Sequence, residues 1–196
     1  MTDDARKRLL EGLNEDLRGE FQAIIMYRLY ASLVQGPYRQ ELRTFFANEI
    51  PEELGHAQIL ADKIAALGGT PVAVPAPVTV VSDAKAMLEA ALKAELEAIG
   101  RYVKRRAEAE AAGEYGLAAE FDAMIADKSN HRNELRLMLA GWLRERRDLD
   151  ARIPSSLRRG GMTPGRAYFW GQLSTAIEPV AGVIGAALRR LLRTPS

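Results

Sequence analysis

Two histidines and three glutamates are the residues of this chain whose types and spacing could do chemistry. His56 and His131 are the only histidines among the 196 residues, and they lie 75 positions apart. Glu20 and Glu95 have the same separation, and each lies among leucine, alanine and isoleucine at the spacing of a helix core. Glu53 precedes His56 by three residues, which puts both side chains on one helical face.

Carboxylates in apolar surroundings have to be compensated. An unpaired carboxylate in a protein core is costly or is forced to take up a proton, so each one needs a positive partner. One glutamate from each of two helices, together with Glu-x-x-His pairs from two further helices, can hold two iron or manganese ions. The sequence therefore predicts a metal site with Glu20, Glu53, His56, Glu95 and His131 as ligands.

The separation of 75 residues belongs to an internal repeat. Laying residues 13–64 on residues 88–139 gives eleven identical positions, where composition alone would give roughly four. Almost all of them fall on one helical face, so the chain is interpreted as two copies of a helical hairpin packed face to face. The identical pairs are Leu13/Leu88, Leu17/Leu92, Glu20/Glu95, Ala23/Ala98, Ile24/Ile99, Tyr27/Tyr102, Leu42/Leu117, Phe46/Phe121, Ile50/Ile125, His56/His131 and Leu60/Leu135.

Two tyrosines belong to the repeated set and are candidates for a catalytic role. Tyr27 and Tyr102 each lie seven residues, or two helical turns, beyond a repeated glutamate. Their phenols could donate hydrogen bonds to the carboxylates of the site. The alternative is an ordinary core tyrosine with an incidental hydrogen bond, which heptad spacing alone also explains.

Four helices are expected to position these residues. Apolar periodicity together with glycine and proline stops predicts helices over residues 3–34, 38–67, 83–112 and 114–148. Residues 70–81 hold three prolines and are expected to be extended, so the third helix could start at either end of the bundle. The predicted fold is all-α, an antiparallel four-helix bundle with one long crossover over residues 1–150.

Three segments of the chain resemble the ferritin-like superfamily, and bacterioferritins most closely. The segments are LNEDLRGEFQAIIMY, EELGHAQILADKIAALGGTP and ELEAIGRY, and the likeness covers residues 8–145. The resemblance implies Glu20 and Glu95 as terminal ligands, Glu53 as a bridging ligand and one histidine for each metal. It also implies one or two iron or manganese ions per chain, oxidation of Fe(II) by dioxygen or peroxide, and a homo-oligomer, from a dimer to a storage cage. Haem is not expected, because Leu54 stands where haem-binding bacterioferritins have methionine.

The chain departs from this family at Lys128, which stands where the resemblance implies a second bridging glutamate. The exchange changes the charge of the site from −4 to −2. In one alternative Lys128 pairs with Glu53 or Glu20 and the site holds one ion or none. In a second, Asp127 supplies a metal-binding carboxylate and Lys128 points away. In a third, Lys128 has a lowered pKa and acts as a proton donor or an oxidisable group.

Glycines adjoin several of the predicted ligands. Gly19 and Gly100 lie next to or near the repeated glutamates, and Gly55 lies next to His56. The missing side chains could open a pocket for an organic substrate, or they could only allow close packing of helices.

Residues 151–196 differ from the rest of the chain. Seven arginines and one acid give them a charge of +6, whereas residues 1–150 carry −5. A Gly- and Arg-rich linker precedes apolar residues at helical spacing over residues 166–193, which predicts an amphipathic helical extension. This helix could dock on the bundle or a neighbouring subunit, lie on a membrane surface, or direct the protein into a protein shell. Nucleic acid is a weak match, since the arginines lack an aromatic stacking platform.

Composition limits the chemistry and the location. The chain has no cysteine, which excludes disulfides, thiolate nucleophiles and iron–sulfur clusters. The N-terminus has no signal-peptide pattern, and the apolar run over residues 180–188 is about half of the roughly 20 residues that span a bilayer. A cytoplasmic location is predicted. The leading functional hypothesis is an iron- or manganese-dependent oxidoreductase, and the alternative is a non-catalytic descendant that Lys128 has neutralised and that serves assembly or binding.

Overall fold

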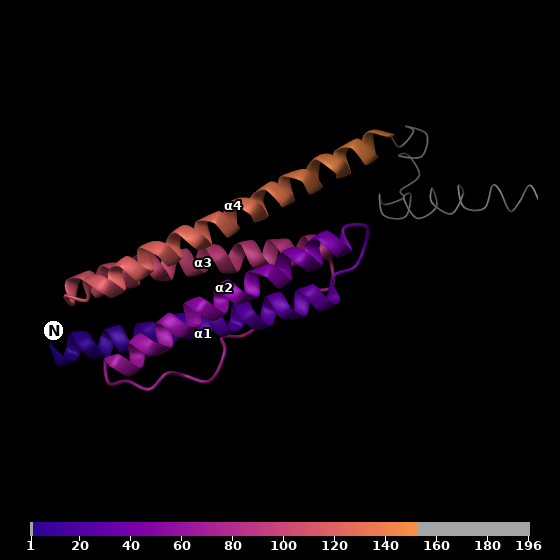
Figure 1. Ribbon diagram of the computed structural model, residues 1–196. Coiled ribbons are helices and arrows are strands. Elements are labelled where there is room, and N and C mark those ends of the chain that lie inside the picture. The colour runs from indigo at the N-terminus through magenta and orange to yellow at the C-terminus, as the bar shows by residue number, and fades with distance from the viewer. Residues whose placement is uncertain (1, 153–196) are drawn as a thin grey trace, which may run out of the picture. The chain divides into compact units, whose positions relative to one another are not determined.

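The fold consists of four helices. The computed structural model describes the backbone of residues 2–152 and the side chains of residues 2–142. The helices are α1 (Asp3–Leu33), α2 (Arg39–Ala66), α3 (Ala84–Ala111) and α4 (Tyr115–Arg152), and the described residues contain no strand (Figure 1). These bounds confirm the predicted all-α bundle, although α4 continues beyond its predicted end at residue 148.

The helix ends follow from local sequence chemistry. The carboxylate of Asp83 accepts a hydrogen bond from the backbone N–H of Ala86 at 2.9 Å, and this contact caps the start of α3. Gly36, Gly68 and Gly113 follow the first three helices and have φ values of 99°, 77° and 78°. Only glycine adopts this left-handed conformation without a steric cost, so these residues stop the helices.

The crossover between α2 and α3 lies along α1. Side chains of Asn14, Gln22 and Tyr30 hydrogen-bond to the backbone of residues 70–72, 77 and 79, in that order. The attachment points advance toward the C-terminal end of α1, so the crossover returns to the end of the bundle where α2 begins (Figure 1). The third helix therefore runs parallel to α2, a choice that the sequence left open.

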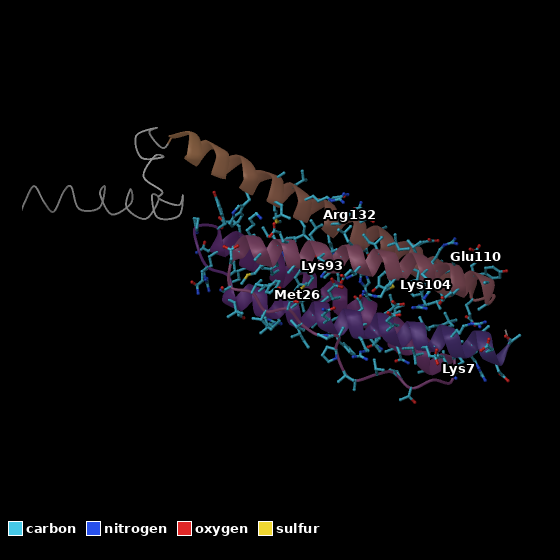
Figure 2. All side chains as sticks on the ribbon, turned by 180° about the vertical axis from the view of Figure 1, so that it is seen from behind. Lys7, Met26, Lys93, Lys104, Glu110 and Arg132 are labelled. Carbon is cyan, nitrogen blue, oxygen red and sulfur yellow. The ribbon has the colours of Figure 1, made fainter. Side chains whose placement is uncertain are left out.

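The core contains two apolar clusters with a charged layer between them. One cluster includes Phe46 and Met87, and the other includes Leu60 and Phe121. Each helix contributes apolar residues to both clusters, and its predicted metal ligands lie between these two contributions. Charged side chains such as Lys93 are on the outer surface (Figure 2). Residues 75 positions apart lie in opposite clusters, as Phe46 and Phe121 do, whereas the repeated charged residues lie together in the layer between them.

The chain divides into two compact units, residues 1–142 and 143–196. The predicted amphipathic extension over residues 166–193 lies outside the described residues, and the predicted boundary at residue 150 stays a prediction. Within the described part of the chain, the structure contains no helix of the length and apolarity that crossing a membrane requires.

Candidate metal centre

Six charged side chains from the four helices meet in the layer between the apolar clusters. All are buried, with no more than 8% of any residue exposed. Helix α1 contributes one of them, α2 contributes two, α3 one and α4 two. The structure thus brings together the five predicted ligands and the unexpected lysine, which are Glu20, Glu53, His56, Glu95, Lys128 and His131.

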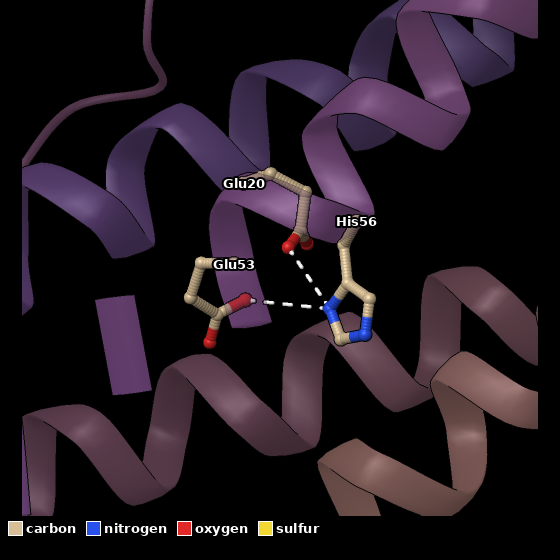
Figure 3. Close-up of side chains that lie close together, drawn as sticks. All are labelled: Glu20, Glu53 and His56. Carbon is tan, nitrogen blue, oxygen red and sulfur yellow. Dashed lines mark ion pairs between the residues drawn. The ribbon is translucent and has the colours of Figure 1, made fainter. Parts of the chain in front are cut away.

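The potential ligand atoms form two groups that share Glu53. In the first group, His56 Nδ1 lies 3.5 Å from Glu20 Oε2 and 3.6 Å from Glu53 Oε2 (Figure 3). In the second group, His131 Nδ1 lies 3.7 Å from Glu95 Oε1. Within each group, one ligand atom of every residue lies within 4.8 Å of the others. Each half of the internal repeat therefore supplies one histidine, and the shared glutamate lies between them.

The outer nitrogen of each histidine contacts a carboxylate from the other half of the repeat. His56 Nε2 lies 3.3 Å from Asp127 Oδ2, and His131 Nε2 lies 3.0 Å from Glu52 Oε2. A second carboxylate, Glu49, also lies 3.0 Å from His131 Nε2. Such contacts orient an imidazole so that its other nitrogen is available, as in metal-binding histidines. Here both Nδ1 atoms face the glutamates.

Asp127 is not brought into either group of ligand atoms. Its side chain is 46% exposed and contacts the outer nitrogen of His56. The alternative in which Lys128 points away from the site is wrong, because its side chain is only 2% exposed and contacts glutamates. Since Lys128 takes the inward direction on α4, the adjacent aspartate points toward the surface between α2 and α4.

The two tyrosines donate crosswise between the halves of the repeat. Tyr27 on α1 donates to Glu95 Oε1, and Tyr102 on α3 donates to Glu20 Oε1. Burial, with the nearby carboxylates, raises the pKa of both phenols well above their ordinary value, so they stay protonated donors. Each tyrosine holds one oxygen of a glutamate, and the other oxygen of that glutamate has no hydrogen-bond partner. A catalytic role for them stays a prediction.

Lys128 lies among all three glutamates of the layer. Its ammonium donates a hydrogen bond to Glu53 Oε2 and lies 3.5 Å from Glu20 Oε2 and 3.6 Å from Glu95 Oε2. Burial by itself would lower the pKa of Lys128, but the three carboxylates raise it above its ordinary value. This direction is opposite to the lowered pKa of the third alternative. Burial alone would likewise raise the pKa of Glu53, but Lys128 and His56 bring it down to about 2.

The other carboxylates are compensated unequally. Burial raises the pKa of Glu20 in spite of Lys128, whereas the lysine and His131 outweigh burial and lower the pKa of Glu95. Burial also raises the pKa of Glu49 to about 7, although His131 opposes this change. The lysine alone therefore does not balance the carboxylates, and in spite of burial these carboxylates raise the pKa of His56 to about 10 and that of His131 to about 9.

The residues of this layer fit a divalent metal ion. Oxygen and imidazole nitrogen atoms are the donors that iron and manganese take in proteins. Buried polar atoms without a hydrogen-bond partner are rare in proteins and call for an explanation. Five such atoms face one another in this layer, and a bound cation would satisfy them. They are Glu20 Oε2, Glu53 Oε1, Glu95 Oε2, His56 Nδ1 and His131 Nδ1.

A second buried ionic cluster, which the sequence analysis missed, lies one helical turn from the layer. Asp16 is fully buried and accepts a hydrogen bond from Arg105 Nε at 2.9 Å. A Cβ atom on Gly12 would overlap the Arg105 guanidinium, and one on Gly19 would overlap that of Arg101. Gly12 and Gly19 thus each make room for one arginine of α3, and the space at Gly19 is filled by Arg101 and is not a pocket. The available signal was an aspartate at core spacing among leucines, four residues before the predicted ligand on α1.

Comparisons with known proteins agree with this geometry. The ferritin-like domain family matches residues 10–143, so the chain belongs to the ferritin-like family. The chain is 32% identical over 132 residues to a bacterioferritin from Streptomyces coelicolor, covering 67% of this chain and 79% of the relative. A bacterioferritin from Brucella melitensis is 30% identical over 125 residues, covering 63% of this chain and 78% of the relative.

Solved structures show the same fold. The crystal structure of a ferritin-like, diiron-carboxylate protein from Bacillus anthracis is similar at 48% identity and a TM-score of 0.69, covering 71% of this chain and 99% of that one. A dodecameric thioferritin from Bacteroides fragilis is 25% identical with a TM-score of 0.67, covering 73% of this chain and 90% of that one. The similarity covers the bundle that positions the charged layer.

Proposed function

We propose that this chain binds iron in the charged layer and oxidises Fe(II) with dioxygen or peroxide. The observation that carries the proposal is the set of buried, unpaired donor atoms on three glutamates and two histidines. Membership of the ferritin-like family supports it. The relatives described as bacterioferritins and as a diiron-carboxylate protein favour iron over manganese.

In the proposed reaction Fe(II) is the substrate and the source of electrons. Each Fe(II) loses one electron and becomes Fe(III). Dioxygen takes up four electrons and four protons to give two waters, whereas hydrogen peroxide takes up two electrons and two protons to give two waters. Carboxylate oxygens attract an ion of charge +3 more strongly than one of charge +2, so the glutamates favour the oxidised product.

The chain's own residues arrange the donors for this task. Tyr102 and Tyr27 each hold one oxygen of a glutamate, and the free oxygens, Glu20 Oε2 and Glu95 Oε2, are among the unpaired atoms of the layer. Carboxylates on the outer nitrogens keep both histidine Nδ1 atoms facing inward. This preorganisation reduces the rearrangement that iron binding requires.

The test is iron binding and Fe(II) oxidation by the full chain purified without chelator. We expect bound iron after anaerobic addition of Fe(II), and faster appearance of Fe(III) in air than in protein-free buffer. Glu53→Gln, at the glutamate shared by both groups, should weaken both. Glu97→Gln is the matched control, because Glu97 is an exposed glutamate of α3. Fewer than about 0.1 iron ions per chain, with no acceleration of oxidation, would refute the proposal.

One observation favours a second candidate function. The hydrogen bond from Lys128 to Glu53 compensates a buried carboxylate without any metal. A bundle stabilised in this way could serve as a non-catalytic assembly or binding module. Absence of iron binding, together with unchanged thermal stability on addition of Fe(II), would favour this function over the first.

Oligomerisation and location complete the proposal. We expect a homo-oligomer, and the dodecameric thioferritin with the same fold supports this expectation. Sedimentation of the full chain would measure the number of subunits. Docking of the C-terminal extension on a neighbouring subunit, a membrane surface or a protein shell stays a prediction, as does the cytoplasmic location.

A further inference from the structure

We infer that the charged layer takes a single divalent ion on the His131 side, and that Lys128 supplies the positive charge of a second ion. This inference rests on the proposed iron binding and specifies its stoichiometry and position. It differs from a dinuclear centre, in which both groups of ligand atoms would be filled together.

The position of the ammonium carries the first part of the inference. Lys128 Nζ contacts all three glutamates from which the two groups are built, and its distances to Glu20 and Glu95 differ by only 0.1 Å. A metal ion in either group draws on Glu53, which is also the hydrogen-bond partner of the lysine. Two ions that share this glutamate would both lie close to a fixed positive charge.

The charge balance of the layer also indicates a single divalent ion. Three carboxylates and one ammonium have a net charge of −2 when the histidines are neutral, and one divalent ion cancels it. A second divalent ion would leave the six side chains of the layer at +2, of which Glu49, the buried carboxylate beside His131, could offset only one unit. Uncompensated charge of this size in a buried site is strongly unfavourable. One ion is therefore the number that the described residues of the layer can neutralise.

The two groups differ in how Lys128 engages their oxygens. Each group holds three atoms without a hydrogen-bond partner: Glu53 Oε1 is common to both, Glu20 Oε2 and His56 Nδ1 belong to the first, and Glu95 Oε2 and His131 Nδ1 belong to the second. In the first group, Glu53 Oε2 lies 3.6 Å from His56 Nδ1 and also accepts a hydrogen bond from Lys128. An ion beside His56 therefore competes with the lysine for an oxygen of Glu53, whereas Glu95 Oε1, 3.7 Å from His131 Nδ1, accepts from Tyr27 and not from the lysine.

The surrounding charges also favour the His131 side. Glu49 and Glu52 both contact His131, and the Glu49 side chain is only 10% exposed. A single aspartate, 46% exposed, contacts His56. One turn before Glu20, the carboxylate of Asp16 is already paired with Arg101 and Arg105, so it adds little attraction for a cation beside His56. A cation thus meets more negative charge, with less screening by water, beside His131.

The experiment counts bound Mn(II), which is stable in air, by equilibrium dialysis and electron paramagnetic resonance. We expect one ion per chain with the spectrum of an isolated Mn(II). His131→Asn should weaken binding at least a hundredfold, and its repeat-related partner His56→Asn should weaken binding less. The control outside the site is Glu97→Gln, at an exposed glutamate of α3, and it should leave the affinity unchanged. Two spin-coupled ions in the wild-type chain would overturn the single-ion inference. Equal losses in the two variants would overturn the assignment to the His131 side.

Variants of the lysine test its part directly. Lys128→Glu should bind two ions, and Lys128→Gln, which removes the charge without adding a ligand, should bind a second ion at millimolar Mn(II). One ion in every folded variant would show that the lysine does not exclude the second ion. Binding of no Mn(II) or Fe(II) by the wild-type chain would refute the proposed function itself, an outcome distinct from binding of two ions.

Discussion

Replacing Lys128 with methionine should destabilise the metal-free protein by about 3–5 kcal/mol, the cost of removing one partner from a buried ion pair. Methionine keeps a long, unbranched side chain but removes the ammonium that contacts Glu20, Glu53 and Glu95. Three buried carboxylates would then lie together without their shared cation.

The size of the expected destabilisation follows from the distances between the charges and from the ability of the carboxylates to take up protons. A pair of charges 3.5 Å apart, as between Lys128 and Glu20, attracts by about 5 kcal/mol at an effective dielectric constant of about 20. The full loss of three such attractions is not expected, because the carboxylates can take up protons instead. Protonating a glutamate of ordinary pKa at pH 7 costs about 3.5 kcal/mol. One such protonation together with residual strain gives the stated range.

The assay is thermal unfolding followed by circular dichroism in buffer with chelator. For a unit of this size, the expected loss corresponds to a melting temperature lower by roughly 10–15 °C. Lys93→Met is the matched control, because Lys93 lies on the outer surface of α3 (Figure 2). Its side chain is 78% exposed, and its ammonium lies 3.8 Å from Glu97. The control should lose less than about 1 kcal/mol. In chelator-free buffer, added Mn(II) should restore part of the melting temperature of Lys128→Met, since it supplies the missing positive charge.

A small effect would refute the reasoning. If Lys128→Met and Lys93→Met unfold within about 1 kcal/mol of each other in chelator, the carboxylates do not depend on the buried ammonium. The single-ion inference would then lose its electrostatic basis as well.

Three further predictions concern other contacts of the bundle. Gly12→Ala should cost about 2–4 kcal/mol in urea unfolding, because the new Cβ would displace the Arg105 guanidinium and leave the buried Asp16 with Arg101 as its one remaining cation. Tyr102→Phe should cost about 1–3 kcal/mol and slow Fe(II) oxidation, since a glutamate oxygen loses its donor. Burial raises the pKa of Asp16 to about 6 from its ordinary 3.8, so the folded chain binds more protons than the unfolded chain between these values. The free energy of unfolding should therefore fall by up to about 3 kcal/mol between pH 4 and pH 6, and Asp16→Asn should remove this part of the pH dependence.

Matched controls separate these effects from general disturbance. Gly100→Ala places its Cβ in open space on the exposed face of α3, so it should be neutral or stabilise the helix by up to about 1 kcal/mol. Tyr115→Phe changes an exposed tyrosine and should leave both stability and Fe(II) oxidation unchanged. Equal losses from the two alanine substitutions, or an unchanged pH dependence in Asp16→Asn, would contradict the role assigned to the second ionic cluster.

The sequence by itself determined the elements and five of the six members of the charged layer, all except Lys128. Helix positions follow from local periodicity and from stops such as Gly68, because backbone geometry is a local property. The repeat then picked out Glu20, Glu95 and the two histidines. Identical polar residues at the same position in two copies fall at the same depth in the bundle, so their meeting could be predicted.

Only the tertiary structure decided how these residues pair. The sequence allowed Lys128 or Asp127 to face the glutamates, since both lie near the inward face of one helix, and packing of four helices selected the lysine. Two further contacts join α1 to α3: Tyr27 donates a hydrogen bond to Glu95, and Arg105 donates one to Asp16. Spacing along one helix fixes the face on which a side chain lies, but the partner across the interface depends on the distance and rotation of another helix. Those quantities are set by the whole core, and no short stretch of sequence contains them.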